Sequence, residues 1–231
     1  MRLRILALSC GVAMFAAACG SDNNGPDGSV DLTEQQTAAL TTALISNGAL
    51  GTEAAAFAPF ALSQLQSAGS FGGYDAVGVQ VNYTVSVGGN TQSGVLSSII
   101  GWQGLNASAQ TVDKIITASQ FSTGGTFPST VTGDFATTGT TGTYFDRSTA
   151  SNYLASTGNF NITGADFSGG TTNCNETSGG VTVTCSYTTG TMTGSFGFTA
   201  DRTNGTGPAT FDQTTTNFEL PALRVTITVS E

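Results

Sequence analysis

The clearest pattern in the chain is an alternation of apolar and polar residues that runs through most of its length after the first third. Valine or tyrosine occupies every second position from Val77 to Val87, and Gly88-Gly89-Asn90 follows as a turn. This period of two predicts a strand with one apolar and one polar face. The same alternation returns from Val181 to Tyr187, from Met192 to Phe198 and from Leu223 to Val229. The pattern predicts a protein built mainly of β-strands.

Other segments carry weaker or different signals. Residues 95–105 are apolar on both faces, which is typical of a central strand that is covered on both sides. Residues 126–137 and 159–167 are weaker strand candidates. Residues 108–120 stay open between a helix and a strand, because their apolar spacing fits a helical stripe while their β-branched content favours a strand.

Helical segments are expected before the strands. Thr33 and Gln36 have the spacing of a capping box, and the apolar stripe that follows ends at Asn47-Gly48. A second segment, from about Thr52 to Ser67, carries apolar residues at helical spacing, although Pro59 interrupts it. We expect these stripes to cover part of a β-sheet.

The first nineteen residues have the pattern of an export signal. Arg2 and Arg4 precede an apolar run, Ile5 to Ala17, that ends in small residues. This run is much shorter than the roughly 20 residues that cross a bilayer as a helix. The sequence Ala16-Ala17-Ala18-Cys19-Gly20 resembles the lipobox of bacterial lipoproteins.

The resemblance implies that the leader is removed and that Cys19 becomes the lipidated N-terminus, which anchors the protein in the bacterial cell envelope. The family's sorting habit favours the outer membrane when Gly20 and Ser21 follow the cysteine, with periplasmic and surface display both open. The alternative is an ordinary signal peptide cut after Ala17 or Ala18, which would give a soluble exported protein.

These signals divide the chain into four parts. Residues 1–18 are the expected signal peptide, 19–31 the lipidated cysteine and a flexible tether, 32–69 a helical segment packing on the sheet, and 70–231 an antiparallel β domain. Thr-Gly turns separate the strands without a fixed repeat period. The expected fold is therefore an antiparallel meander that forms a sandwich or a strongly curved, half-open barrel sheet.

Charge excludes some partners. Charged residues are only 9% of the chain, and the net charge is −9. Without the leader, the basic residues that stand against 15 acidic ones are Lys114, Arg147, Arg202 and Arg224. Such a chain builds no basic patch, so neither nucleic acid nor anionic lipid headgroups are expected partners. The predicted membrane contact is the N-terminal lipid.

Two cysteines remain after the leader. Cys174 and Cys185 flank a turn-rich segment, and we predict a disulfide between them, as suits an exported protein. A metal site would need further ligands, and the chain contains no histidine. We predict neither a metal nor a cofactor.

Motifs for catalysis are missing from the sequence. Without histidine there is no Ser-His-Asp triad, and neither a G-x-S-x-G elbow nor a glycine-rich nucleotide loop occurs. Carboxylate pairs are the remaining route to catalysis or cation binding. Six aspartates lie near predicted strand ends, where aspartate also forms ordinary turns: Asp75, Asp134, Asp146, Asp166, Asp201 and Asp212. We interpret them as turn and rim residues and predict a non-enzymatic protein.

Two functions agree with this sequence. The first is a structural or interaction module displayed at the envelope, and the second is a carrier of a lipid or another apolar molecule inside the curved sheet. A carrier needs an apolar cavity, and the candidate lining residues are Val81, Trp102, Phe196 and Phe198. In an interaction module the same side chains would be packed solid.

Overall fold

A computed structural model describes most of the chain after the predicted tether: residues 30–47, 67–124, 129–136, 138–173, 175–178 and 180–230. The predicted signal peptide, Cys19 and nearly all of the second helical segment lie outside the described residues. The described elements are β1 (Val30–Asp31), α1 (Glu34–Ser46), β2 (Ser67–Phe71), β3 (Tyr74–Val87), β4 (Asn90–Gln103), β5 (Lys114–Thr123), β6 (Val131–Asp134), β7 (Thr140–Asp146), a 3₁₀ turn (Arg147–Thr149), β8 (Ser151–Asp166), β9 (Thr171–Asn173), β10 (Glu176–Ser178), β11 (Val181–Asn204) and β12 (Thr210–Ser230).

The helix α1 begins where the capping box predicts. The Gln36 backbone N–H donates to Thr33 Oγ1 at 3.2 Å, and the Thr33 N–H donates to Gln36 Oε1 at 2.9 Å. Two N–H groups that the first turn leaves without helical partners are thereby satisfied. The helix ends at Ser46 with Asn47 as its C-cap, where the sequence predicts the stop.

Two boundaries differ from the expectation. The strand β2 starts at Ser67, so the end of the predicted helical segment at residue 69 is wrong. Val30 and Asp31, which were assigned to the tether, form the short strand β1 beside β2. Residues 114–123, within and just beyond the ambiguous segment 108–120, form the strand β5.

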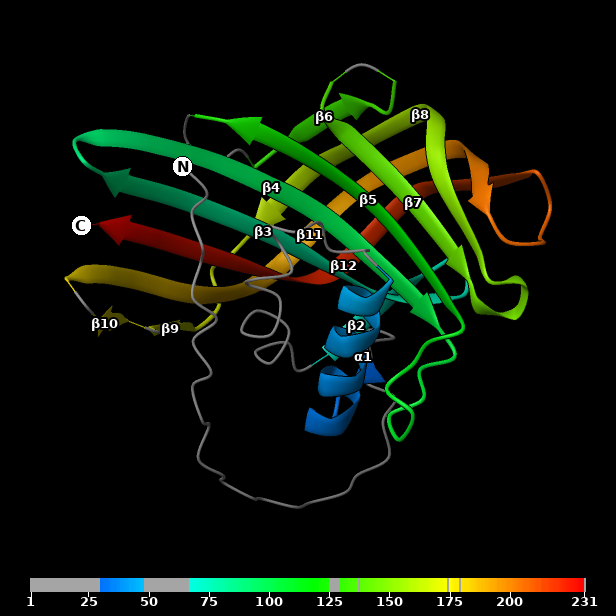
Figure 1. Cartoon of the computed structure of the whole chain (residues 1–231), viewed down its shortest axis with the longest axis horizontal. Helices are drawn as coiled ribbons and strands as arrows, with labels where there is room; N and C mark the ends of the chain where they lie inside the picture. The colour runs from blue at the N-terminus through cyan, green and yellow to red at the C-terminus, as the bar shows by residue number, and fades with distance from the viewer. Residues whose placement is uncertain are drawn as a thin grey trace.

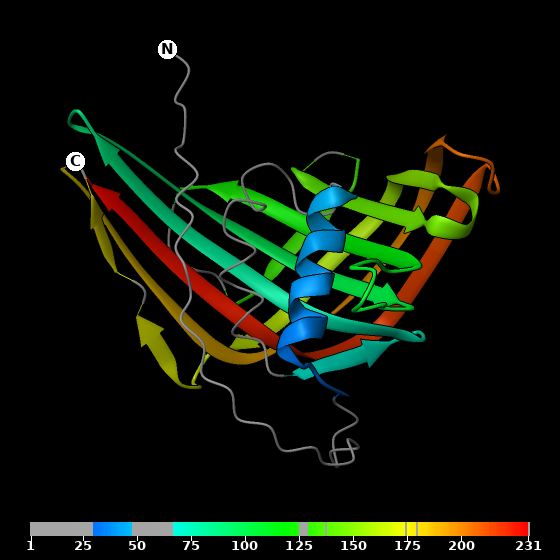
Figure 2. The ribbon, with the colours of Figure 1, turned by 60° about the horizontal axis from the view of Figure 1, so that its bottom comes forward.

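Seven strands form a meander that closes on itself. In the order β3, β4, β5, β7, β8, β11 and β12, each strand pairs antiparallel with the next. The last strand, β12, then pairs in parallel with the first, β3 (Figures 1 and 2). The parallel pairing follows from the odd number of strands, because the first and last strands of such a meander point the same way. The predicted strongly curved meander is confirmed, and the parallel closure makes the sheet mixed.

The ring of strands is not a regular cylinder. Ser151–Leu154 of β8 pair with β7, whereas Asn159–Ile162 of the same strand pair with β6. The long strands β11 and β12 stay paired from residue 182 to residue 201 with a bulge near Gly194, and they bend around the molecule (Figure 2). One pair of strands thus contributes to several parts of the surface.

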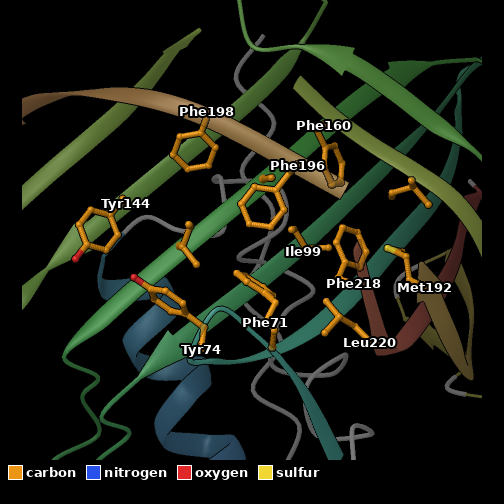
Figure 3. Close-up of a cluster of buried hydrophobic side chains, with 14 of the residues drawn as sticks. Phe71, Tyr74, Ile99, Tyr144, Phe160, Met192, Phe196, Phe198, Phe218 and Leu220 are labelled. Atoms are coloured by element: carbon orange, nitrogen blue, oxygen red, sulfur yellow. The ribbon is translucent and has the colours of Figure 1, made fainter. Parts of the chain in front are cut away.

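The interior of the ring is filled by aromatic side chains (Figure 3). The Phe196 ring lies edge-on to Phe71 at 5.1 Å between centroids, and Phe198 meets Phe135 at 5.2 Å. A Cβ on the interior-facing Gly101 would lie 2.8 Å from the Phe71 ring. Any side chain at residue 101 would therefore force the ring of Phe71 to move.

The opposite face of β3, β4 and β12 carries a second apolar cluster, which α1 covers. Leu40 and Leu44 of the helix are fully buried and pack with Trp102 and Val81. The strand β4 has buried apolar residues in both clusters, which confirms the prediction of a doubly covered strand at 95–105.

We predict that Phe196→Ala lowers the free energy of unfolding by about 3–5 kcal/mol, because it opens a cavity among the aromatic side chains that fill the inside of the β-sheet. Urea unfolding followed by circular dichroism measures this change. Leu154→Ala is the matched control, since Leu154 is 50% exposed, and its expected effect is below about 0.5 kcal/mol. Equal effects of the two substitutions would contradict the assignment of Phe196 to the core.

Candidate functional site

The four residues predicted to line an apolar cavity lie on opposite faces of the sheet. Val81 and Trp102 belong to the cluster under α1, whereas Phe196 and Phe198 belong to the ring interior. All four are buried. Phe196 and Phe198 lie 6.0 Å apart and contact further aromatic rings on their other sides. The structure thus does not bring the four residues together around one cavity.

A row of polar side chains crosses the interior of the ring. Neighbouring strands place these residues side by side in register: Thr188, Arg224, Gln80, Ser97, Gln120 and Thr140. Arg224 Nε donates to Gln80 Oε1 at 3.0 Å, and Gln80 Nε2 donates to Ser97 Oγ at 3.2 Å. We call this set the interior polar row.

The interior polar row includes a cation, Arg224, in a largely apolar environment. The guanidinium of Arg224 lies 4.1 Å from the centroid of the Phe167 ring, a favourable cation–π position. Burial lowers the pKa of Arg224 from its ordinary value. The hydrogen bond that Arg224 donates to Gln80 offsets part of the cost of desolvation.

Gln80 and Asn82 correct an expectation from the sequence. Their alternation with valines predicts a polar face in solvent, yet Gln80 is 1% exposed and Asn82 is 0% exposed. Both amide atoms of Asn82 lack a hydrogen-bond partner. The polar face of β3 is buried because the sheet curls around it.

The outer face of β8, β11 and β12, beyond the area near α1, contains an open groove. Its volume is about 520 Å³. Along β11 it is lined by the consecutive residues Ser195, Phe196, Gly197, Phe198 and Thr199, and the strands on either side add these residues: Thr157, Gly158, Asn159, Asp212, Thr214 and Thr215. The Thr199 hydroxyl donates to Asp212 Oδ1 at 2.5 Å across the groove wall.

A second hollow continues the groove along the same strand. It has a volume of about 330 Å³ and shares Ser195 with the first, and its other lining residues are Thr163, Thr193, Gly194, Asn217, Phe218 and Glu219. Ser195, Gly197 and Thr199 are half-buried, whereas Thr157, Asn159 and Asp212 beside them are exposed. The middle strand is thus recessed between higher walls, and we call the two hollows together the β11 groove.

Two of the predicted cavity residues, Phe196 and Phe198, border the β11 groove, but the sequence analysis did not predict the groove itself, although a signal was present. Between Met192 and Phe198 the alternate positions are Thr193, Ser195 and Gly197. This alternation shows that one face of the strand is small and polar. It does not show that the two neighbouring strands raise walls beside it.

The aspartates behave largely as turn and rim residues. Asp134 Oδ1 accepts from the Ala136 N–H, and Asp146 Oδ1 accepts from the Ser148 N–H, which confirms the turn role of these two. Burial raises the pKa of Asp75. Within the described ranges, no three cysteine or acidic side chains gather closely enough to hold a metal ion.

The predicted disulfide cannot be followed at both ends, because Cys174 lies outside the described residues. The residues on either side of Cys174 in the sequence, Asn173 and Asn175, lie next to Cys185 and Ser186. Asn173 pairs with Ser186 across β9 and β11, and the Cys185 N–H donates to Asn175 Oδ1 at 3.2 Å. The disulfide between Cys174 and Cys185 stays a prediction that this register supports.

Comparison of the chain with models of protein families, with curated proteins and with solved structures gives no match. In the part of the chain that the structure describes, no helix has the length and apolar character needed to span a membrane. The site therefore has to be interpreted from its own geometry.

We predict energetic coupling between Gln80 and Arg224. Gln80→Leu removes an acceptor from a partly buried guanidinium, so it should lower the free energy of unfolding by about 1–3 kcal/mol. With Arg224→Leu in a double-mutant cycle, the coupling energy should reach about 1 kcal/mol.

The exposed pair Ser86 and Thr91 is the control for this cycle. Their hydroxyls lie 2.9 Å apart across the neighbouring β3–β4 turn. Alanine at both positions should give coupling below about 0.5 kcal/mol. Coupling between Gln80 and Arg224 no larger than that of the control would contradict a stabilising role for the interior polar row.

Proposed function

We propose that this chain is an exported bacterial lipoprotein, lipidated at Cys19 and held at the cell envelope, that acts as a non-enzymatic interaction module. It engages its partner through the outer face of β8, β11 and β12. The filling of the ring interior carries this proposal, because it leaves the hollowed outer face as the available binding surface. The predicted disulfide between Cys174 and Cys185 would stabilise the β9–β11 edge in an oxidising compartment.

The distribution of polar and apolar side chains supports an interaction module over a carrier. A carrier encloses its ligand in an apolar cavity of several hundred Å³. Here Phe196 is packed between Phe71, Phe198 and Phe218. The outer face, by contrast, presents an open groove with hydroxyl, amide and carboxylate walls.

The anchor is tested by growing the expressing bacterium with radiolabelled palmitate. We expect label on the full-length protein and none on Cys19→Ala, which should also leave the membrane fraction, because lipid chains provide the membrane affinity. Cys10→Ala is the matched control. Cys10 lies within the expected signal peptide, so this variant should keep the label on Cys19. An unlabelled wild-type protein, or a Cys19→Ala variant that still fractionates with membranes, would refute lipid anchoring.

The carrier is tested by native mass spectrometry of the Cys19→Ala protein purified from cells. We expect the mass of the polypeptide alone, because aromatic side chains fill the ring interior. A co-purified lipid or other apolar molecule in a fixed ratio would overturn the interaction module in favour of a carrier.

A further inference from the structure

We propose that the β11 groove binds a neutral, hydroxyl-rich glycan chain in an extended form. This inference rests on the proposed function, because it names the class of partner that the interaction module recognises. Shape, an unexplained glycine and the chemistry of the walls support it separately.

The shape of the groove fits a linear ligand. The two hollows share Ser195 and together follow β11 from Thr193 to Thr199. Six residue steps along a strand span about 20 Å. An open trough of this length favours a chain that lies along it over a compact molecule that needs enclosure.

Gly197 forms the floor of the groove without any packing reason to be glycine. A Cβ at this position would have its nearest neighbour at 3.5 Å, an ordinary van der Waals contact. Gly158 beside it differs, since its φ is 126° and a Cβ there would collide with the Gly197 carbonyl. Glycine in a strand interior weakens the strand and often marks the close approach of a ligand. Gly197 therefore keeps open the space that a side chain would fill.

In the β11 groove, side chains and not the backbone of β11 are available to form hydrogen bonds with a ligand. The backbone of β11 is already paired with β8 on one side and β12 on the other. An added peptide strand would find no free backbone partners here, since that mode of binding uses a sheet edge. Hydroxyls of Thr157, Ser195 and Thr214, with the Asn159 amide, instead suit a ligand that is rich in hydroxyl groups.

The charge of the groove selects against anions. Its charged lining residues are Asp212 and Glu219, and the lining that the structure describes includes neither lysine nor arginine. A phosphate, sulfate or uronate polymer would bring like charge next to these carboxylates. A neutral glycan fits this set of groups best.

The test uses the full chain with Cys19→Ala, so that lipid attachment does not affect the binding measurement. Cellohexaose, maltohexaose, laminarihexaose and chitohexaose are titrated by calorimetry. At least one should bind with a dissociation constant between about 10 µM and 1 mM, as befits an open polar groove. Polygalacturonate and hexalysine are the anionic and cationic probes, titrated in about 0.5 M salt so that screening removes the attraction of hexalysine to Asp212 and Glu219. Both should bind at least about tenfold more weakly.

Gly197→Val is the decisive variant, because it fills the groove floor at a position with room for a side chain. It should keep the melting temperature and weaken glycan binding at least about tenfold. Gly170→Val is the matched control, since a Cβ there meets nothing within 4 Å and Gly170 lies outside the groove. It should bind as the unsubstituted protein does. Should Gly197→Val not fold, Asn159→Ala on the exposed wall takes its place with the same expectation.

Three results would overturn the proposal: no binding of any neutral hexaose at about 10 mM, unchanged binding by Gly197→Val, or tighter binding of either charged probe. Tighter binding of hexalysine would indicate a cationic peptide as the partner. These results are separate from those that test the proposed function. Missing palmitate or a co-purified lipid would defeat the anchored interaction module, whereas failure of the hexaoses alone would defeat only the glycan.

Discussion

The contact between aromatic rings and interior glycines is the constraint on which the rest of this structure depends. A seven-stranded ring leaves a narrow interior, and rings such as Phe71 fit only where the facing strand has no side chain, as at Gly101. Removal of these apolar side chains from water, together with their close packing, supplies most of the favourable free energy of a core. The protein's own side chains therefore fill the inside of the ring of strands. For this reason we propose the outer face of the sheet as the surface that binds a partner.

The closure of the ring creates three different environments from one sheet. The interior is aromatic toward one end and polar along the row from Thr188 to Thr140. One part of the outer face is apolar and packs under α1, and another part, over β8, β11 and β12, is open and polar. The strands β11 and β12 pass through all three environments, so the residues that each strand contacts differ from one end to the other. The same strand pair therefore stabilises the core and presents the groove.

Much of the architecture could be predicted because it depends on local periodicity. The valine alternation of β3, the capping box at Thr33 and the doubly apolar strand β4 each appear where the pattern indicates. The site was less predictable. Phe196 and Trp102 are buried as apolar residues should be, yet they belong to different clusters. Alternation identifies which residues share a face of one strand, and it does not say which face of the sheet will enclose them.

The sequence by itself indicated the strands with clear alternation, the first helix and its cap, because each depends on residues close together in the chain, and it determined the acidic balance as a sum over all residues. Only the tertiary structure decided that β12 returns to pair with β3, that Gln80 and Asn82 lie inside a ring, and that Gly197 opens a groove between two walls. Those features depend on the curvature of the whole sheet. Curvature arises from the sum of strand twist and side-chain packing over many residues, so no single segment of the chain encodes it.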